Sequence, residues 1–191
     1  MTHLVTPDAR WHDSWAGTIR EFGDEFPHGS GIGEGEVLEG RAACELFVAE
    51  RLRFADPAAR LPDGMVPCDY FWIADGDEVI GFVALRHRLN DWLFEMGGHI
   101  GYSVRPSRRR QGHAGRALAL ALGRARELGL DRVLLTCDED NRASRLTIEG
   151  GGGVYEDTRN GKQRFWIDLT RAATPEGSVS RPRDGAGAAP A

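Results

Sequence analysis

The sequence predicts an α/β (α+β) fold in one globular domain, and three observations support this prediction. Hydrophobic residues recur at helical spacing in the first third of the chain and alternate at strand spacing from Tyr70 onward. The later part follows the order strand, helix, strand, helix, strand, which allows a parallel pair of strands with a ligand site at their carboxyl ends. The length of 191 residues suits one domain with a sizeable core, or one domain with a tail.

The N-terminal part, residues 1–68, is predicted to be mostly helical and to belong to the same domain. Apolar residues at helical spacing predict a helix over 9–22, and a second helix is expected over 37–54, before a segment rich in Asp, Pro and Gly. The glycine-rich stretch 29–35 between them is flanked by acidic residues, and no strand precedes it. We therefore interpret it as a flexible linker and not as a phosphate-binding loop.

Residues 69–169 are predicted to form the core of the domain. It begins with a hairpin, because a tight-turn sequence, Asp75-Gly76-Asp77, separates two β-rich runs. The expected elements are strands at 70–74, 79–85 and 99–104, an amphipathic helix at 112–128, a strand at 132–137, a short helix from Asn141 to Gly150, and strands near 154–155 and 164–169.

The final segment, residues 170–191, is dominated by Ala, Gly, Pro and Ser without an apolar period, so we expect a disordered tail. No apolar run reaches the roughly 18–20 residues of a membrane span. The net charge of −5 argues against a general nucleic-acid binder. Three cysteines without metal-ligand spacing and an N-terminus without a signal pattern favour a cytoplasmic protein with no metal, no membrane partner and no nucleic-acid partner.

A basic segment, Arg109-Arg110-Gln111-Gly112-His113-Ala114, links the strand at 99–104 to the amphipathic helix. The first turn of a helix leaves backbone N–H groups without partners and carries positive potential. Gly112, Ala114 and Gly115 are small, so a diphosphate can approach the backbone. Two interpretations are open on these residues alone: a diphosphate-binding loop, and a solvated basic turn before an ordinary helix.

Arg109, Gly112 and Ala114 match the Arg/Gln-x-x-Gly-x-Gly/Ala acyl-CoA signature of the GNAT superfamily of N-acetyltransferases. The preceding strand end, Val104-Arg105-Pro106, also matches, and Asn141-Arg142-Ala143-Ser144 resembles the family's Asn-x-x-Ala/Ser segment. The chain therefore resembles a GNAT protein from about residue 70 to residue 169. Three further segments resemble a bacterial subgroup of predicted acetyltransferases: 85–90, 97–102 and 136–141.

The resemblance implies a mixed, strongly twisted sheet flanked by helices, with splayed central parallel strands at 100–104 and 132–137. It also implies an acyl-CoA site in which strand backbone holds the pantetheine arm and loop N–H groups hold the pyrophosphate. The cofactor-binding residues implied in this way are Ser103, Val104, Arg109, Arg110, Gln111, Gly112, His113, Ala114, Gly115, Asn141 and Ser144.

The activity implied is transfer of an acetyl (acyl) group from acetyl-CoA, the cosubstrate, to an amine by direct attack in a ternary complex. The acceptor expected is a small-molecule or peptide amine, no metal is expected, and a homodimer is possible because dimers are common in the family. A non-catalytic acyl-CoA binding or sensing module is the alternative. It is motivated by two departures: the family's usual carboxylate position falls near Gly98, and Ile148 stands where many relatives have a tyrosine.

Candidates for the missing catalytic groups lie nearby in the sequence. His99 and Glu95 are the candidate bases, since a base must deprotonate an alkyl amine before it attacks. Tyr102 is the candidate acid, with Tyr155 as a second choice. Each also has a structural interpretation: a histidine satisfied by hydrogen bonds in a sheet, a surface carboxylate, and tyrosines that pack in strands.

Polar residues that follow the second hairpin strand, Arg86, His87 and Asn90, are candidates for the acceptor pocket. Arginines there suit an amine that carries a carboxylate. Salt links to Asp91 or Glu95 are the alternative interpretation, and the residues alone do not decide between the two.

Overall fold

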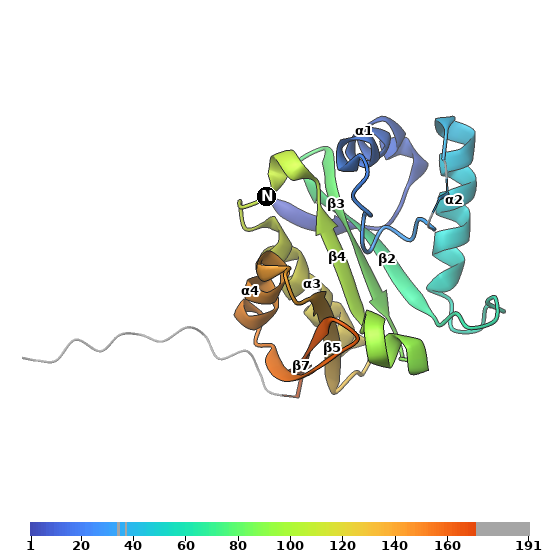
Figure 1. Ribbon diagram of the computed structural model, residues 1–191. Helices are drawn as coiled ribbons and strands as arrows, with labels where there is room; N and C mark the ends of the chain where they lie inside the picture. The colour runs from blue at the N-terminus through green and yellow to red at the C-terminus, as the bar shows by residue number, and fades with distance from the viewer. Residues whose placement is uncertain (34, 37, 171–191) are drawn as a thin grey trace, which may run out of the picture.

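A computed structural model describes residues 1–33, 35–36 and 38–170 of the chain (Figure 1). The predicted disordered tail lies outside the described residues from residue 171 onward. The elements are β1 (Thr2–Val5), the 3-10 turn η1 (Ala9–Trp11), α1 (His12–Phe22), α2 (Gly40–Phe54), β2 (Cys68–Asp75), β3 (Glu78–Arg86), the π-helical turn η2 (Leu93–Gly97), β4 (Ile100–Val104), the 3-10 turn η3 (Pro106–Arg108), α3 (His113–Glu127), β5 (Arg132–Asp138), α4 (Arg142–Gly150), β6 (Val154–Arg159) and β7 (Lys162–Asp168).

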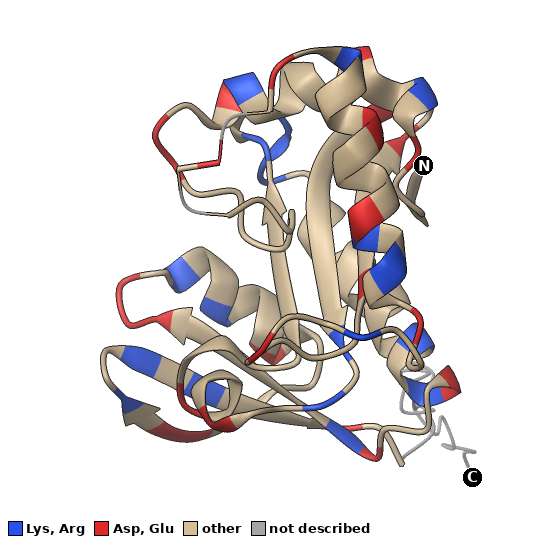
Figure 2. Cartoon of the chain, turned by 90° about the vertical axis from the view of Figure 1, so that its right-hand side faces the viewer, with Lys and Arg blue, Asp and Glu red and all other residues tan. Residues whose placement is uncertain are grey.

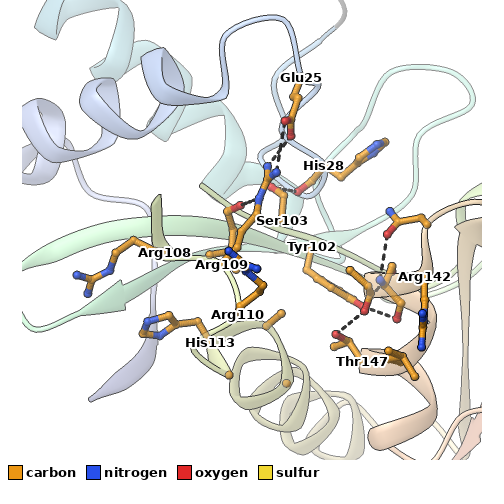
Figure 3. Close-up of a pocket in the computed structure, with 18 of the residues that line it drawn as sticks. Glu25, His28, Tyr102, Ser103, Arg108, Arg109, Arg110, His113, Arg142 and Thr147 are labelled. Carbon is orange, nitrogen blue, oxygen red and sulfur yellow. Dashed lines mark hydrogen bonds and ion pairs between the residues drawn. The ribbon is translucent and has the colours of Figure 1, made fainter. Parts of the chain in front are cut away.

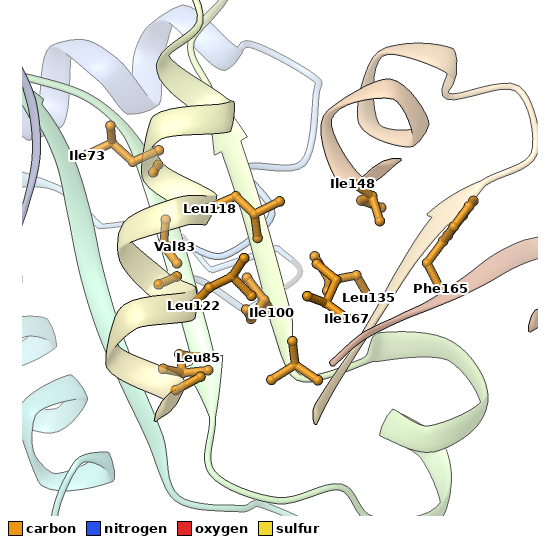
Figure 4. Packing of buried hydrophobic residues seen from close by; sticks show 14 of the residues in the cluster. Ile73, Val83, Leu85, Ile100, Leu118, Leu122, Leu135, Ile148, Phe165 and Ile167 are labelled. Atoms are coloured by element: carbon orange, nitrogen blue, oxygen red, sulfur yellow. The ribbon is translucent and has the colours of Figure 1, made fainter. Parts of the chain in front are cut away.

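The strands form two antiparallel sheets, one in the order β1-β2-β3-β4 and the other in the order β5-β7-β6. Helices cover both faces of the larger sheet. On one face, Trp15 of α1 and Phe47 of α2 pack with Trp72 and Phe82 in an aromatic core. On the other face, α3 packs against β2, β3 and β4 and joins both sheets in the main core (Figure 4). The predicted α/β class with helices flanking twisted strands is confirmed.

The two sheets meet at strands β4 and β5, which are joined by backbone hydrogen bonding only near the start of β4. The backbone N–H of His99 donates to the carbonyl oxygen of Leu134 at 2.6 Å, and among the described residues no hydrogen-bonded ladder continues from there. A mixed, strongly twisted sheet with splayed central parallel strands was expected; in the structure the strands form two antiparallel sheets that separate between β4 and β5. The carboxyl ends of β4 and β5 both lead to one cavity, which fits the predicted splay.

Two predictions for the N-terminal part were wrong. Residues 2–5 form strand β1, paired antiparallel with β2, although a helical lead-in was expected. The supposed flexible linker is packed: Ser30 is 2% exposed, and a Cβ on Gly29 would lie 2.4 Å from the carbonyl oxygen of Gly101. Gly29 therefore serves close approach to β4, and Gly31 packs against Tyr70 and Arg51, whereas a Cβ on Gly35 would meet no atom within 4 Å. Helix α2 begins at Gly40 and not at 37, and Val37 itself is not described.

Charged residues lie mainly on helices and loops around the sheets, with both signs interspersed (Figure 2). None of the described helices is long and apolar enough to cross a membrane.

Gly98 is essential to the contact between the sheets. Its φ is +65°, and a Cβ there would lie 2.6 Å from the carbonyl oxygen of Leu134. We expect Gly98→Ala to lower the free energy of unfolding by more than about 2 kcal/mol, because it combines a left-handed backbone with a backbone clash. Urea unfolding measures this. Gly123→Ala is the matched control in open space on α3, and it should be neutral or stabilise by up to about 1 kcal/mol.

Candidate functional site

A cavity of about 810 Å³ lies at the carboxyl ends of β4 and β5 (Figure 3). Its volume is within the range of sites for small ligands and cofactors, roughly 300–1,000 Å³. Four parts of the chain line it: α1 with the loop that follows it (Phe22, Glu25, Phe26, His28), β4 (Tyr102, Ser103, Val104), the loop and first turn of α3 (Arg108, Arg109, Arg110, Gly112, His113, Ala114, Gly115), and the start of α4 (Asn141, Arg142, Ala143, Ser144, Leu146, Thr147).

The first turn of α3 lines this cavity and carries backbone N–H groups without partners in the helix. Arg110 (φ +60°) and Gly112 (φ +78°) are both left-handed, and this double turn leads the chain from η3 into the helix. The first helical hydrogen bond runs from the N–H of Arg116 to the carbonyl oxygen of Gly112. The N–H groups before it have no acceptor within the helix, and no described side chain caps this end. A Cβ at Gly115 would meet no atom within 4 Å, so an anion has room here.

Charges around the first turn of α3 are partly neutralised and partly free. Arg109 forms an ion pair with Glu25, and its Nε donates to the carbonyl oxygen of Val104 at 2.9 Å. This pairing holds the pKa of the Glu25 carboxyl below its usual range. Arg110 and Arg142 line the cavity without a side-chain hydrogen bond or ion pair to any described residue. Two unpaired cations thus remain available for an anionic ligand.

One edge of β4 is open to the cavity. The N–H of Arg86 donates to the carbonyl oxygen of His99, and the N–H of Arg105 donates to that of Ile80. Peptide groups alternate in direction along a strand. The backbone N–H and C=O groups of Gly101 and Ser103 therefore point toward β3, whereas those of Tyr102 and Val104 point away from it. The peptide groups of Tyr102 and Val104 are therefore placed to hydrogen-bond an extended ligand in the manner of an added strand.

Helix α4 closes the other side of the cavity. Asn141 is its N-cap, and its Oδ1 accepts from the N–H of Ser144 at 3.0 Å. The Tyr102 hydroxyl lies 3.0 Å from the Oγ of Ser144 and connects β4 to α4. Burial raises the pKa of Tyr102, so its hydroxyl stays protonated at neutral pH. Ile148, at the position where the resemblance leads us to expect a tyrosine, is fully buried in the main core.

Two residues of the predicted loop have their side chains bonded elsewhere. The His113 ring is 5% exposed, and its Nδ1 lies 2.8 Å from the Oγ1 of Thr2 on β1, so it fixes the helix to the sheet. Burial lowers the pKa of His113. Gln111 is not among the residues that line the cavity, and its Nε2 donates to the carbonyl oxygen of Ser107 at 3.3 Å. Gln111 therefore closes the turn before α3.

The candidate bases His99 and Glu95 do not line the cavity. His99 is 7% exposed, and its Nδ1 accepts from the N–H of Leu134 at 2.9 Å. Burial lowers its pKa to about 4, and the positive charges of Arg86 and Arg132 act in the same direction. Glu95 forms an ion pair with Arg159 at 2.8 Å. Both side chains have partners that give them structural roles.

The candidate acceptor residues also lie outside the lining of the cavity. The Nη1 of Arg86 donates to the carbonyl oxygens of Gly97 and Gly98, so neither proposed salt link forms. The Nε2 of His87 lies 2.9 Å from the Oδ1 of Asp69. Asn90 donates to the carbonyl oxygen of Gly64 at 2.7 Å and accepts from Leu93 N–H, which fixes the start of η2.

The sequence analysis missed every lining residue on α1 and the segment after it, namely Phe22, Glu25, Phe26 and His28, and it also missed Leu146 and Thr147 of α4. Ser103 Oγ donates to the carbonyl oxygen of His28 at 2.7 Å, across 75 positions of sequence. No local pattern predicts a contact over such a separation. Among the described residues, no group of three or more His, Cys, Asp or Glu side chains is arranged to hold a metal ion.

A model of the acetyltransferase (GNAT) family matches residues 37–148 of the chain, whereas no curated protein matches it. Similar solved structures include the Microcin C7 self immunity acetyltransferase MccE in complex with acetyl-CoA and AMP, which is 15% identical with a TM-score of 0.63 over 87% of this chain and 92% of that chain. RimL, a ribosomal L7/L12 alpha-N-protein acetyltransferase in complex with coenzyme A, is 14% identical with a TM-score of 0.62 over 87% and 93%. An acetyl transferase from Salmonella typhimurium, which modifies the N-terminal serine of ribosomal protein L7/L12, is 14% identical with a TM-score of 0.56 over 87% and 94%. These likenesses establish the same fold.

Proposed function

The chain belongs to the acetyltransferase (GNAT) family, and on this basis we propose that it transfers the acetyl group of acetyl-CoA to an amine acceptor by direct attack. One observation carries the proposal: a single cavity joins the uncapped first turn of α3 to the open edge of β4. The turn suits a diphosphate and the strand edge suits the amide-bearing pantetheine arm.

The residues present fit coenzyme A at both ends of this cavity. The N–H groups at the start of α3, with Arg110 and Arg142, would hold the phosphates by charge-assisted hydrogen bonds. Small residues there leave room for close approach. The carboxylate of Glu25 is the one unfavourable group, and its ion pair with Arg109 offsets its charge. Asn141 and Ser144 belong to the α4 wall, where Asn141 caps the helix and Ser144 holds the Tyr102 hydroxyl.

When bound, acetyl-CoA supplies an activated thioester. The peptide groups of Tyr102 and Val104 would fix the arm that carries it, and α4 excludes water from one side. Tyr102 stays protonated and lies in the lining, so it is our candidate for hydrogen bonding to the departing sulfur. A thiol has a pKa near 8.5, so departure as a thiolate is feasible without a strong acid. We place the base at neither His99 nor Glu95, because both are engaged outside the cavity.

Two assays test the proposal. CoA at about 100 times its Kd should raise the melting temperature by about 5–10 °C. Thiol release from acetyl-CoA should then be measured with polyamines, amino acids and short peptides with free N-termini, including a serine peptide because a similar structure modifies an N-terminal serine. No thermal shift at millimolar CoA contradicts the proposal. A shift without thiol release from any amine favours the non-catalytic binding module instead.

Glu25 gives a prediction about charge in the cavity. Glu25→Gln removes a carboxylate from the lining and frees Arg109 for the ligand, so we expect CoA to bind roughly 2- to 5-fold more tightly at low salt. Isothermal titration calorimetry measures the change. Asp24→Asn is the matched control: it changes the net charge equally but does not line the cavity, and its effect should be less than half as large. Weaker binding by Glu25→Gln would show that the ion pair organises the site.

A further inference from the structure

Among the carboxylate, histidine and tyrosine side chains of the described lining, that of His28 is the one that forms no hydrogen bond or ion pair. Four of its described lining residues can act in proton transfer: Glu25, His28, Tyr102 and His113. Glu25 is paired with Arg109, the Tyr102 hydroxyl is bonded to Ser144, and the His113 ring is bonded to Thr2. The His28 ring is exposed and has no side-chain hydrogen bond to a described residue; its one ring contact is with Phe26, at 5.1 Å between centroids.

The backbone that carries His28 is held against β4. Its carbonyl oxygen accepts from the Oγ of Ser103 at 2.7 Å. At the next residue, Gly29 lies so close to β4 that a Cβ would be 2.4 Å from the carbonyl oxygen of Gly101. The imidazole is therefore presented from a fixed segment and not from a loose loop (Figure 3).

The position of His28 corresponds to the reacting end of the cavity. The phosphate end is at the first turn of α3, which follows the carboxyl end of β4. A ligand arm that runs from there along the open edge of β4 passes Val104 and then Tyr102, which brings its far end to the middle of the strand. His28 and Gly29 cover β4 at Ser103 and Gly101, in this same middle part.

We propose that His28 is the general base that takes a proton from the acceptor amine. The inference rests on the proposed function above. The acceptor enters as an ammonium ion, and His28 takes one proton from its nitrogen and returns that proton to solvent. The neutral nitrogen then forms a bond to the acetyl carbon and the C–S bond breaks, with a thiolate as the leaving group. The second proton of the nitrogen passes to this thiolate, which leaves as the thiol of CoA.

The electrostatic surroundings keep His28 neutral at pH 7, as a base requires. Partial burial lowers its pKa below the usual 6.5, Lys162 of β7 and Arg86 of β3 lower it further, and Asp138 of β5 raises it. Lys162 and Asp138 are themselves an ion pair. A lone pair on the ring is therefore available at neutral pH, and protonation removes it only below about pH 6.5.

The test compares wild type, His28→Gln and His28→Ala, with His3→Gln as the matched control on an exposed part of β1. Thiol release from acetyl-CoA is measured from pH 5.5 to 9 with the amine that turns over in the panel above, and with hydroxylamine, which is already largely neutral at pH 7. We expect both His28 variants to lose about 10²-fold in kcat with the alkyl amine. They should also lose the limb of the pH profile below pH 6.5, whereas turnover of hydroxylamine should fall much less.

The CoA-induced thermal shift separates catalysis from binding, and it should be unchanged in all variants. Activity within threefold of wild type, or an equal loss with both acceptors, overturns the role of His28 as a base. So does a lost thermal shift, because His28 would then act in binding. These results leave the proposed function intact, since the wild type would still turn over. A wild type that releases no thiol with any acceptor overturns both.

Discussion

The substitution Gly115→Asp is expected to weaken CoA binding so strongly that it is lost at ordinary CoA concentrations. The same substitution is expected to stabilise the folded protein. Gly115 is the third residue of α3, lines the cavity, and has no atom within 4 Å of its Cβ position. An aspartate there replaces a poor helix former and places a negative charge at the positive end of the helix, which adds about 0.5–1 kcal/mol to the free energy of unfolding. The same carboxylate occupies the position proposed for the diphosphate. Two like charges about 4 Å apart near a protein surface repel by about 4 kcal/mol, so affinity should fall about 10³-fold.

Two controls isolate the cause of this effect. Gly115→Asn adds a side chain of the same size without the charge and should weaken binding much less. Gly123→Asp adds the same charge to the same helix, outside the cavity lining and in open space, and it should change the Kd by no more than about twofold. Calorimetric titration of CoA gives the Kd, and urea unfolding gives the free energy of unfolding. A Gly115→Asp protein that binds CoA normally contradicts the phosphate site.

The second large effect is a pH dependence of stability that originates at His99. Its pKa is lowered from 6.5 to about 4 in the folded protein by burial and by Arg86 and Arg132. Between these two values the unfolded chain binds more protons than the folded one, so the free energy of unfolding falls as the pH falls from 6.5 to 4. The difference in pKa corresponds to roughly 3 kcal/mol. Burial is the largest cause of this shift, and the hydrogen bond that Nδ1 accepts from Leu134 N–H also requires an unprotonated Nδ1.

The comparison with His99→Asn tests this assignment. Asparagine retains an acceptor near the position of Nδ1 but does not titrate, so the stability advantage of wild type over the variant should shrink by roughly 3 kcal/mol between pH 7 and pH 4. Urea unfolding at several pH values measures this difference in the free energy of unfolding. The contributions of all other titrating groups are common to both proteins and cancel in the difference. His3→Asn, at an exposed site on β1, should show no such trend. If the difference in free energy of unfolding between wild type and His99→Asn stays constant from pH 7 to pH 4, the pH dependence does not originate at His99.

The order of core elements could be predicted because their signals are local. The hairpin, the strand before Pro106 and the amphipathic α3 each have a period or a turn residue within a short stretch. Strand β1 was missed because four residues are too short to show a period. The segment at Gly29 was misinterpreted because glycines that permit close packing look the same as glycines of a linker.

In the candidate site, too, residues of a local motif could be predicted from the sequence, whereas residues whose roles depend on distant contacts could not. Arg109, Gly112 and Ala114 lie on one strand–helix junction, so a motif predicts them together, and the structure places all three in the cavity lining. The role of His99 depends on Leu134, which is 35 residues away. His28 reaches the cavity only because Ser103, 75 residues later, binds its carbonyl oxygen. Spacing along the chain contains no information about either contact.

A crystal structure with CoA bound tests the central claim most directly. The account predicts diphosphate oxygens within hydrogen-bonding distance of the N–H groups at the start of α3, at Gly112 to Gly115. It also predicts that the pantetheine arm lies along Tyr102 and Val104. CoA bound outside this cavity, or inside it with the diphosphate away from the first turn of α3, would contradict the account.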